Sequence, residues 1–169
     1  WEIGAKRGWT NKDENGLEWS NSFTPWIFKE GKGASNGQTI KVPFWESQGA
    51  YTVEWTYDNT SNSYKRKNGG SDHSDLNNRK QLEAKNVVIQ FERESNANDG
   101  YENNVHLLYG TTGTGKALLL QNGTVTEGKW TKATRITRTK YTDNANKEIE
   151  FVKGAIWIQT VPEGSKVPY

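Results

Sequence analysis

The stretch that decides the fold is ALLLQNGTVTEGKW, residues 117–130, in which two strand-like segments flank Asn122-Gly123. Asn and Gly tolerate the positive φ angles of a type I′ turn, so this dipeptide predicts a β-hairpin with strands over 117–121 and 124–130. Further β segments are expected over 105–109, 134–142, 148–152 and 155–161, with turns at 143–146 and 152–155. So many short segments in sequence predict an antiparallel meander or a small barrel-like sheet.

Upstream of this hairpin, apolar and polar residues alternate with a period of two. In AYTVEWTYD (50–58), Tyr, Val, Trp and Tyr share one face, as a half-buried strand requires. The segment 40–44 alternates in the same way, and Pro43 predicts that it forms a sheet edge, because proline cannot donate to a neighbouring strand. The β-branched segment 86–92 predicts a more central strand.

Helical periodicity is scarce. The best candidate is 75–84, where Asp75 would cap a short helix, and loops are expected over 11–16 and 65–75. No repeat or linker divides the chain. We therefore expect a single mainly β domain over 1–169, with at most one or two short helices and a β-rich α+β fold as the alternative.

Aromatic residues supply the bulk of the expected core. Only 32% of the residues are hydrophobic, but 12% are aromatic, including eight Trp. Trp55, Trp130 and Trp157 fall in predicted strands and are expected in the core. The others lie near loops or edges, where they would cover the sheet or face another part of the protein: Trp1, Trp9, Trp19, Trp26 and Trp45.

Charge and cysteine content exclude several classes of function. The net charge is +2, from 22 basic and 20 acidic residues that are interspersed along the chain, so no nucleic-acid partner is expected. The absence of Cys excludes disulfides, thiolate metal sites and a cysteine nucleophile within the chain. The chain begins at Trp1 and contains no Met, which is typical of a segment of a longer protein.

The stretch YGTTGTGKALLL (109–120) resembles a phosphate-binding P-loop in its Gly110 and Gly115-Lys116 spacing. A P-loop needs a following helix and a Ser or Thr hydroxyl for Mg²⁺, but Ala117 replaces that residue and a hairpin turn follows at once. We therefore expect a glycine-rich connection between strands, with Lys116 solvated or at an edge.

The densest polar cluster is SDHSD (71–75). His73 with Asp72 and Asp75 could hold a ligand or perform acid–base chemistry, whereas the alternative is that both carboxylates support a turn. Tyr64 and Arg66 either contact a ligand or protect a strand edge. His106 is expected to be a half-buried strand residue. No nucleophile motif supports an enzyme, and neither a metal nor a cofactor is expected.

The string GTGKALLLQNGTVTEGKWTK, followed by YTDNANKEIEFVKGAIWIQTVP, resembles the C-terminal domain of the YerB-like lipoproteins, a family of unknown function common in Gram-positive bacteria. The matching positions are Gly113, Gly115, Ala117, Gly123, Gly128, Trp130, Asp143, Gly154 and Trp157-Ile158, with Ile156 in place of the usual Thr. Upstream, the matching positions are Tyr64, Arg66, Gly70, His73, Asp75, Asn86 and Val87. The resemblance covers 18–162, and the leading segment 1–18 matches only loosely.

This resemblance implies an extracytoplasmic protein whose lipid anchor and separate N-terminal domain would precede Trp1, and it implies no established reaction. We expect a non-catalytic module that binds its own N-terminal domain, an envelope protein or a cell-wall glycan, and that meets the membrane only through the anchor. The expected binding residues are Tyr64, Arg66, His73, Asp75 and Asn86. The alternatives are an envelope-polymer hydrolase or transferase that uses His73 with Asp75, and a purely structural domain.

Overall fold

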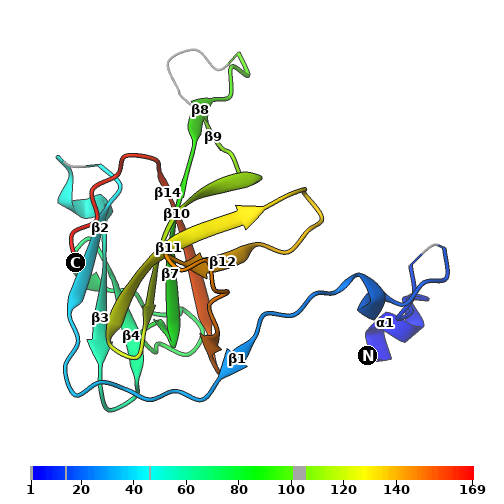
Figure 1. Ribbon diagram of the computed structural model, residues 1–169, viewed down its shortest axis with the longest axis horizontal. Coiled ribbons are helices and arrows are strands. Elements are labelled where there is room, and N and C mark those ends of the chain that lie inside the picture. The colour runs from blue at the N-terminus through cyan, green and yellow to red at the C-terminus, as the bar shows by residue number, and fades with distance from the viewer. Residues whose placement is uncertain (1, 14, 46, 101–105) are drawn as a thin grey trace.

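The computed structural model describes residues 2–13, 15–45, 47–100 and 106–169, and strands dominate it (Figure 1). The mainly β prediction is confirmed. Within the described residues, helical structure is limited to α1 (Glu2–Lys6) and the 3-10 turns η1 (Trp19–Ser22) and η2 (Gly49–Tyr51). The strands there form two five-stranded sheets and two small pairs, without a closed barrel.

The central sheet contains the predicted hairpin. Its strands, in spatial order, are β12 (Lys140–Asp143), β11 (Thr124–Lys132), β10 (Gly113–Gln121), β7 (Asn86–Glu92) and β14 (Ile156–Pro162). The first four are antiparallel to their neighbours, whereas β14 pairs with β7 in parallel, so the sheet is mixed. Every residue of β7 is buried, which confirms that it is a central strand.

The glycines of the hairpin have two different roles. Asn122 and Gly123 have φ angles of 52° and 79°, as the predicted type I′ turn requires. Gly115 lies inside β10, not between strands as expected, because β10 already begins at Gly113. A Cβ at Gly115 would come within 2.5 Å of the Trp130 Nε1 and 2.6 Å of the Phe91 carbonyl oxygen. The glycine is therefore required by the close approach of the Trp130 indole.

The side sheet is antiparallel. Its path runs β2 (Thr39–Pro43), β3 (Thr52–Asp58), β4 (Ser63–Asn68) and β5 (Ser71–Asp72), and β6 (Glu83–Ala84) also pairs with β4. The edge position of β2 agrees with the prediction from Pro43. The prediction of a continuous loop over 65–75 is wrong, because most of this segment belongs to β4 and β5.

One core lies between the two sheets. It is built from side chains of both, including Ile40 and Trp55 from the side sheet and Val87 and Leu118 from the central sheet, all fully buried. Each large apolar side chain buried in this way contributes about 1.5–3 kcal/mol. Trp157 packs against this core and is half-buried, so the predicted core roles of Trp55 and Trp157 are confirmed.

A second core covers the opposite face of the central sheet. Trp130, Tyr141 and Phe151 are buried there, and Trp26 packs against them. The covering layer is formed by β1 (Phe28–Lys29) and β13 (Phe151–Val152), which pair in parallel. In chain order, β13 lies between β12 and β14, which are the two edge strands of the central sheet.

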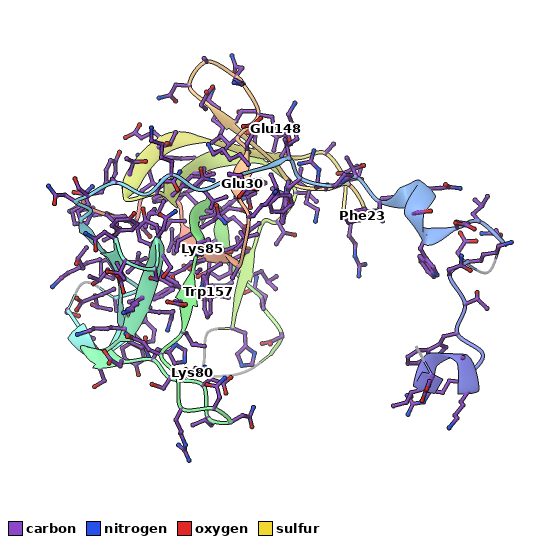
Figure 2. The ribbon with its side chains drawn as sticks, turned by 90° about the horizontal axis from the view of Figure 1, so that it is seen from below. Phe23, Glu30, Lys80, Lys85, Glu148 and Trp157 are labelled. Carbon is purple, nitrogen blue, oxygen red and sulfur yellow. The ribbon has the colours of Figure 1, made fainter. Side chains whose placement is uncertain are left out.

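The segment before β1 extends away from the sheets, with α1 at its far end (Figures 1 and 2). It exposes several large apolar side chains: Ile3, Trp9, Leu17, Trp19 and Phe23. Trp45 is also exposed, whereas Trp26 is half-buried. Trp1 lies outside the described residues.

Three local predictions are wrong. The segment 75–84 is a turn and not a helix, because Arg79 takes a left-handed φ of 61° and Ser74 pairs with Gln81 across the turn. The predicted strand 134–142 shortens to β12. His106 is exposed, precedes β9 (Leu107–Tyr109) and lies 2.5 Å from the Asp99 carboxylate; Val105, the expected start of that strand, is outside the described residues.

The small pair of β8 (Glu94–Asn96) and β9 projects from the body as a ribbon (Figure 1). In the part of the chain that the structure describes, no helix has the length and apolar character to cross a bilayer.

Candidate functional site

Arg66 occupies an unusual position between the two sheets. It lies on β4 opposite Trp55 of β3, and its side chain faces inward, with only 8% of the residue exposed. The guanidinium carbon lies 5.0 Å from the ring centroid of Trp157 and 5.8 Å from that of Trp55. Both rings therefore provide cation–π contacts, while burial lowers the pKa of the Arg66 guanidinium.

His73 is held beside Arg66 by the backbone. Its N–H donates to the Arg66 carbonyl at 3.1 Å, and its carbonyl accepts the Leu82 N–H at 2.8 Å. The Nη1 of Arg66 contacts the Nδ1 of His73. Because a guanidinium can only donate, Nδ1 accepts, which places the proton of the neutral imidazole on Nε2. The structure thus brings together two of the five predicted site residues.

The other three predicted residues have structural contacts. Tyr64 is buried, its hydroxyl donates to the Thr124 carbonyl at 3.3 Å, and burial raises its pKa. Asp75 accepts hydrogen bonds from the N–H groups of Asn77 and Asn78 at 2.8 and 3.1 Å. It therefore caps a turn, which was the alternative to a ligand-binding role.

Asn86 is fully buried at the start of β7. Its side-chain amide donates to the Val152 carbonyl at 2.8 Å and accepts the Val152 N–H at 2.8 Å. A third bond reaches the Ala155 carbonyl at 3.3 Å. Asn86 therefore fastens β13 to the central sheet.

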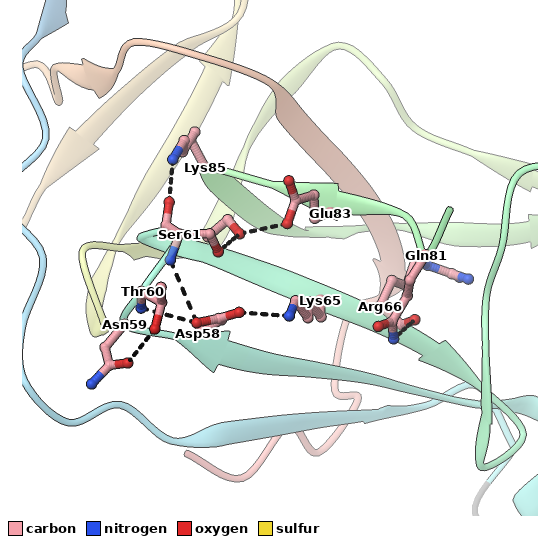
Figure 3. Close-up of polar contacts among 10 residues, drawn as sticks. Asp58, Asn59, Thr60, Ser61, Lys65, Arg66, Gln81, Glu83 and Lys85 are labelled. Carbon is pink, nitrogen blue, oxygen red and sulfur yellow. Dashed lines mark hydrogen bonds and ion pairs between the residues drawn. The ribbon is translucent and has the colours of Figure 1, made fainter. Parts of the chain in front are cut away.

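A polar network stiffens the β3–β4 hairpin beside Arg66 (Figure 3). Asp58 accepts the Lys65 ammonium at 2.5 Å and the Thr60 N–H at 2.9 Å, and the hydrogen bond from Lys65 is the main reason that its pKa is lowered. On the same face of β4 as Lys65, the Ser63 hydroxyl donates to Glu83 at 2.9 Å. These contacts hold the strand that carries Arg66.

A groove of about 740 Å³ lies where the leading segment joins the body. Its walls come from residues 23–28 and from the loop between β11 and β12, and Phe23 is labelled in Figure 2. Phe23 and Ile136 are 73% and 93% exposed, so large apolar side chains face solvent on both walls. Trp26 is fixed below them, because its Nε1 donates to the Thr139 carbonyl at 2.8 Å.

The lining of the groove carries three cations and no acidic residue. Arg138 is paired with Glu148 at 2.7 Å. Lys132 interacts electrostatically with the buried carboxylate of Glu92. Burial raises the pKa of Glu92, and the positive charge of Lys132 lowers it to a smaller extent. Among the described residues, no ion pair involves Arg135. An occupant of this groove would therefore meet apolar walls and net positive charge.

Sequence reasoning did not find this groove. Its walls are separated by more than a hundred positions along the chain, and the local signals are only the aromatic segment 23–28 and the basic segment 131–140. In the basic segment, Ile136 stands alone among Arg, Lys and Thr residues. This isolated apolar residue was the signal that could have indicated an exposed apolar anchor.

The arrangement gives little support to catalysis. Asp75 caps its own turn while His73 contacts Arg66, and among the described residues no hydrogen bond joins the His73 and Asp75 side chains. Within the described ranges, no group of three or more His, Cys, Asp or Glu side chains could hold a metal ion. Lys116 of the P-loop-like stretch lies 3.8 Å from Glu127 on the surface, as expected for a solvated residue.

Comparisons with known proteins agree with this fold. A family model described as protein of unknown function (DUF3048), C-terminal domain, matches residues 40–158. The crystal structure of YerB protein from Bacillus subtilis matches with a TM-score of 0.72 and 20% sequence identity. That match covers 99% of this chain and 52% of the YerB chain, so the chain spans about half the length of YerB. No curated protein matches the chain.

Proposed function

The chain belongs to the DUF3048 C-terminal domain family, and from this membership we propose that it is a non-catalytic binding module of a bacterial cell-envelope lipoprotein. The envelope location rests on the resemblance of its motifs to the YerB-like lipoproteins of Gram-positive bacteria. The binding role rests on one observation, the groove between residues 23–28 and the β11–β12 loop. A concave, mostly apolar pocket of this size with a few polar groups is the usual form of a binding site.

The occupant that fits this groove is an extended segment of a partner protein with an apolar side chain beside acidic residues. Phe23 and Ile136 provide apolar walls for an anchor side chain, and Arg135, which forms no ion pair with another described residue, provides a positive charge. The two contacts together would give affinity and orientation. The partner is either the protein's own N-terminal domain or another envelope protein.

A cell-wall glycan fits the groove less well. Sugar rings need flat aromatic faces together with many hydrogen-bonding groups, whereas the lining contains no Asp, Glu, Asn or Gln. The exposed aliphatic side chain of Ile136 is unsuited to a sugar but suited to another apolar side chain. We therefore favour a protein partner over a glycan.

The test measures the fluorescence anisotropy of a labelled peptide that carries Leu and Phe between Glu residues. We expect saturable binding, and we expect Ile136→Asp to weaken it at least about tenfold, because a carboxylate then replaces the apolar wall and repels the peptide. A peptide with Lys in place of Glu should not bind. Lys41→Glu, an exposed charge reversal on β2, is the matched control and should leave binding unchanged.

Equal binding by wild type and Ile136→Asp would remove the groove as the docking surface. Sedimentation with purified peptidoglycan supplies the opposite result. If Ile136→Asp abolished that sedimentation while the peptide failed to bind, the partner would be a glycan and the proposal of a protein segment would be wrong.

A further inference from the structure

We propose a second binding site, for a carboxylate group, between the two sheets at Arg66 and Gln159. It shares no residue with the lining of the groove, so it stands or falls independently of the function proposed above. Its ligand would place carboxylate oxygens against the Nε–H of Arg66 and the Nε2–H of Gln159.

Arg66 is a buried cation without an acidic partner among the described residues. Among the described residues, no salt bridge involves Arg66, and its buried Nε has no hydrogen-bond partner. Stacking on Trp55 and Trp157 offsets part of the desolvation penalty but satisfies none of the N–H groups. Buried charges are almost always paired, so a hydrogen-bond acceptor would be stabilised at this position.

Gln159 leaves another buried donor unpaired in the same cluster. Gln159 is 5% exposed on β14, two residues beyond Trp157. Its Oε1 accepts the Nε1–H of Trp55 at 3.2 Å, which fixes the orientation of the amide and leaves Nε2 buried without a partner. Trp55 contacts both Arg66 and Gln159, so the two unpaired donors border the same indole ring.

The groups around Arg66 determine which kind of ligand fits and from which side it enters. The side chains of Arg66, Gln159 and His73 all offer N–H groups here, because the tautomer of His73 carries its proton on Nε2. A site made of donors selects an acceptor, and a planar carboxylate matches the fork of a guanidinium. His73 and Trp157 are only half-buried, so they form the side of the cluster through which a small group reaches Arg66.

The direct test is two-dimensional ¹H–¹⁵N NMR of the whole chain titrated with sodium acetate, with sodium chloride at equal ionic strength as the reference. We expect saturable shifts of the Arg66 Nε–H and of the Gln159 side-chain amide, with a Kd on the order of 1 mM for so small a ligand. Acetamide, which has the same shape without the charge, should not produce them. N-acetylglycine and glucuronate then distinguish a peptide carboxylate from a sugar acid.

Two variants at one position keep the test independent of folding. Gln159→Glu supplies a carboxylate from the chain itself, so acetate binding should disappear while the folded state becomes more stable. Gln159→Met removes the donor, and acetate should bind at least about fivefold more weakly to a protein that still folds. Lys65→Gln, on the opposite face of β4 from Arg66, should leave acetate affinity unchanged.

Two results would overturn the proposal. One is the absence of saturable shifts with acetate while both N–H groups show contacts to water, which would mean that ordered water alone satisfies them. The other is that acetamide shifts the same signals as strongly as acetate, because the site would then have no preference for a carboxylate.

Discussion

The two faces of the central sheet bury polar groups of opposite kinds. On the face that β13 covers, the Tyr141 hydroxyl donates to Gln90 at 2.6 Å, and the Gln90 amide contacts the buried carboxylate of Glu92. On the face that meets the side sheet, the buried charge is the cation of Arg66. Among the described residues, one face therefore holds a buried carboxylate that forms no ion pair, and the other holds a buried cation that forms none.

The difference lies in how far each cluster satisfies itself. The hydrogen bonds among Tyr141, Gln90 and Glu92 leave one carboxylate oxygen of Glu92 unpaired. Burial raises the pKa of Glu92, which favours the protonated, neutral form of this carboxyl group. A guanidinium does not lose its proton in a protein, so Arg66 cannot become neutral in the same way. A buried carboxylate can be a self-contained part of a core, whereas a buried arginine calls for an anion from elsewhere.

The largest expected effect is on the face that contains Glu92. Trp130→Ala removes a buried indole whose Nε1 donates to the Phe91 carbonyl at 2.7 Å, and it leaves an empty space above Gly115. We expect the free energy of unfolding to fall by about 3–5 kcal/mol, measured by urea denaturation. A loss below about 1 kcal/mol would show that this core is not tightly packed around the indole.

The next effect tests the titration of Glu92. Its pKa in the folded state lies above the ordinary value of 4.5, so the stability that this group contributes is complete below that value and is lost as the pH rises through the folded pKa. Glu92→Gln removes this loss. We expect the variant to be more stable than wild type at pH 7, by on the order of 1 kcal/mol, with no advantage at low pH.

Urea denaturation at several pH values between about 4 and 8 measures this difference. Gln159→Glu is the counterpart on the other face: it should also stabilise the protein at neutral pH, but by adding a negative charge next to Arg66. If Glu92→Gln destabilised the protein at every pH, the carboxylate would be satisfied as an anion and the contrast between the two faces would fail.

The smallest expected effect concerns the covering layer. Trp26→Phe keeps an aromatic ring against Phe151, which lies 5.2 Å from it between centroids, but removes the bond to the Thr139 carbonyl. We expect a loss of about 1 kcal/mol in the free energy of unfolding. An effect as large as that of Trp130→Ala would mean that the covering layer, and not the sheet, carries the stability of this face.

Local chemistry explains which parts of the fold were predictable. Asn122-Gly123 forms its turn from the conformational freedom of two adjacent residues, and Pro43 marks an edge through its missing N–H, so both could be recognised from sequence. The prediction of a helix over 75–84 was wrong because an Asp side chain caps the start of a helix and a turn in the same way. Only the left-handed backbone of Arg79 distinguishes the two.

The site was predictable only in part, because its contacts join distant segments. Arg66 and His73 were both expected to contact a ligand, and their side chains do contact each other. The indole of Trp157 and the amide of Gln159 complete their surroundings, although both lie about ninety positions further along the chain. No sequence pattern near Arg66 predicts these two neighbours. Gly115 shows the same limit: its need for no side chain comes from Trp130 on the neighbouring strand, not from its own turn.

The parallel pairing of β14 with β7 has a consequence for the order of folding. Residues 86–92 leave the ribosome long before residues 156–162, and Val161 and Val167 are needed to finish the core between the sheets. Until then, the apolar strands β7 and β10 lack part of their cover and are open to pairing with other chains. These strands are therefore expected to need shielding, during synthesis, until residues 156–167 have been added to the chain.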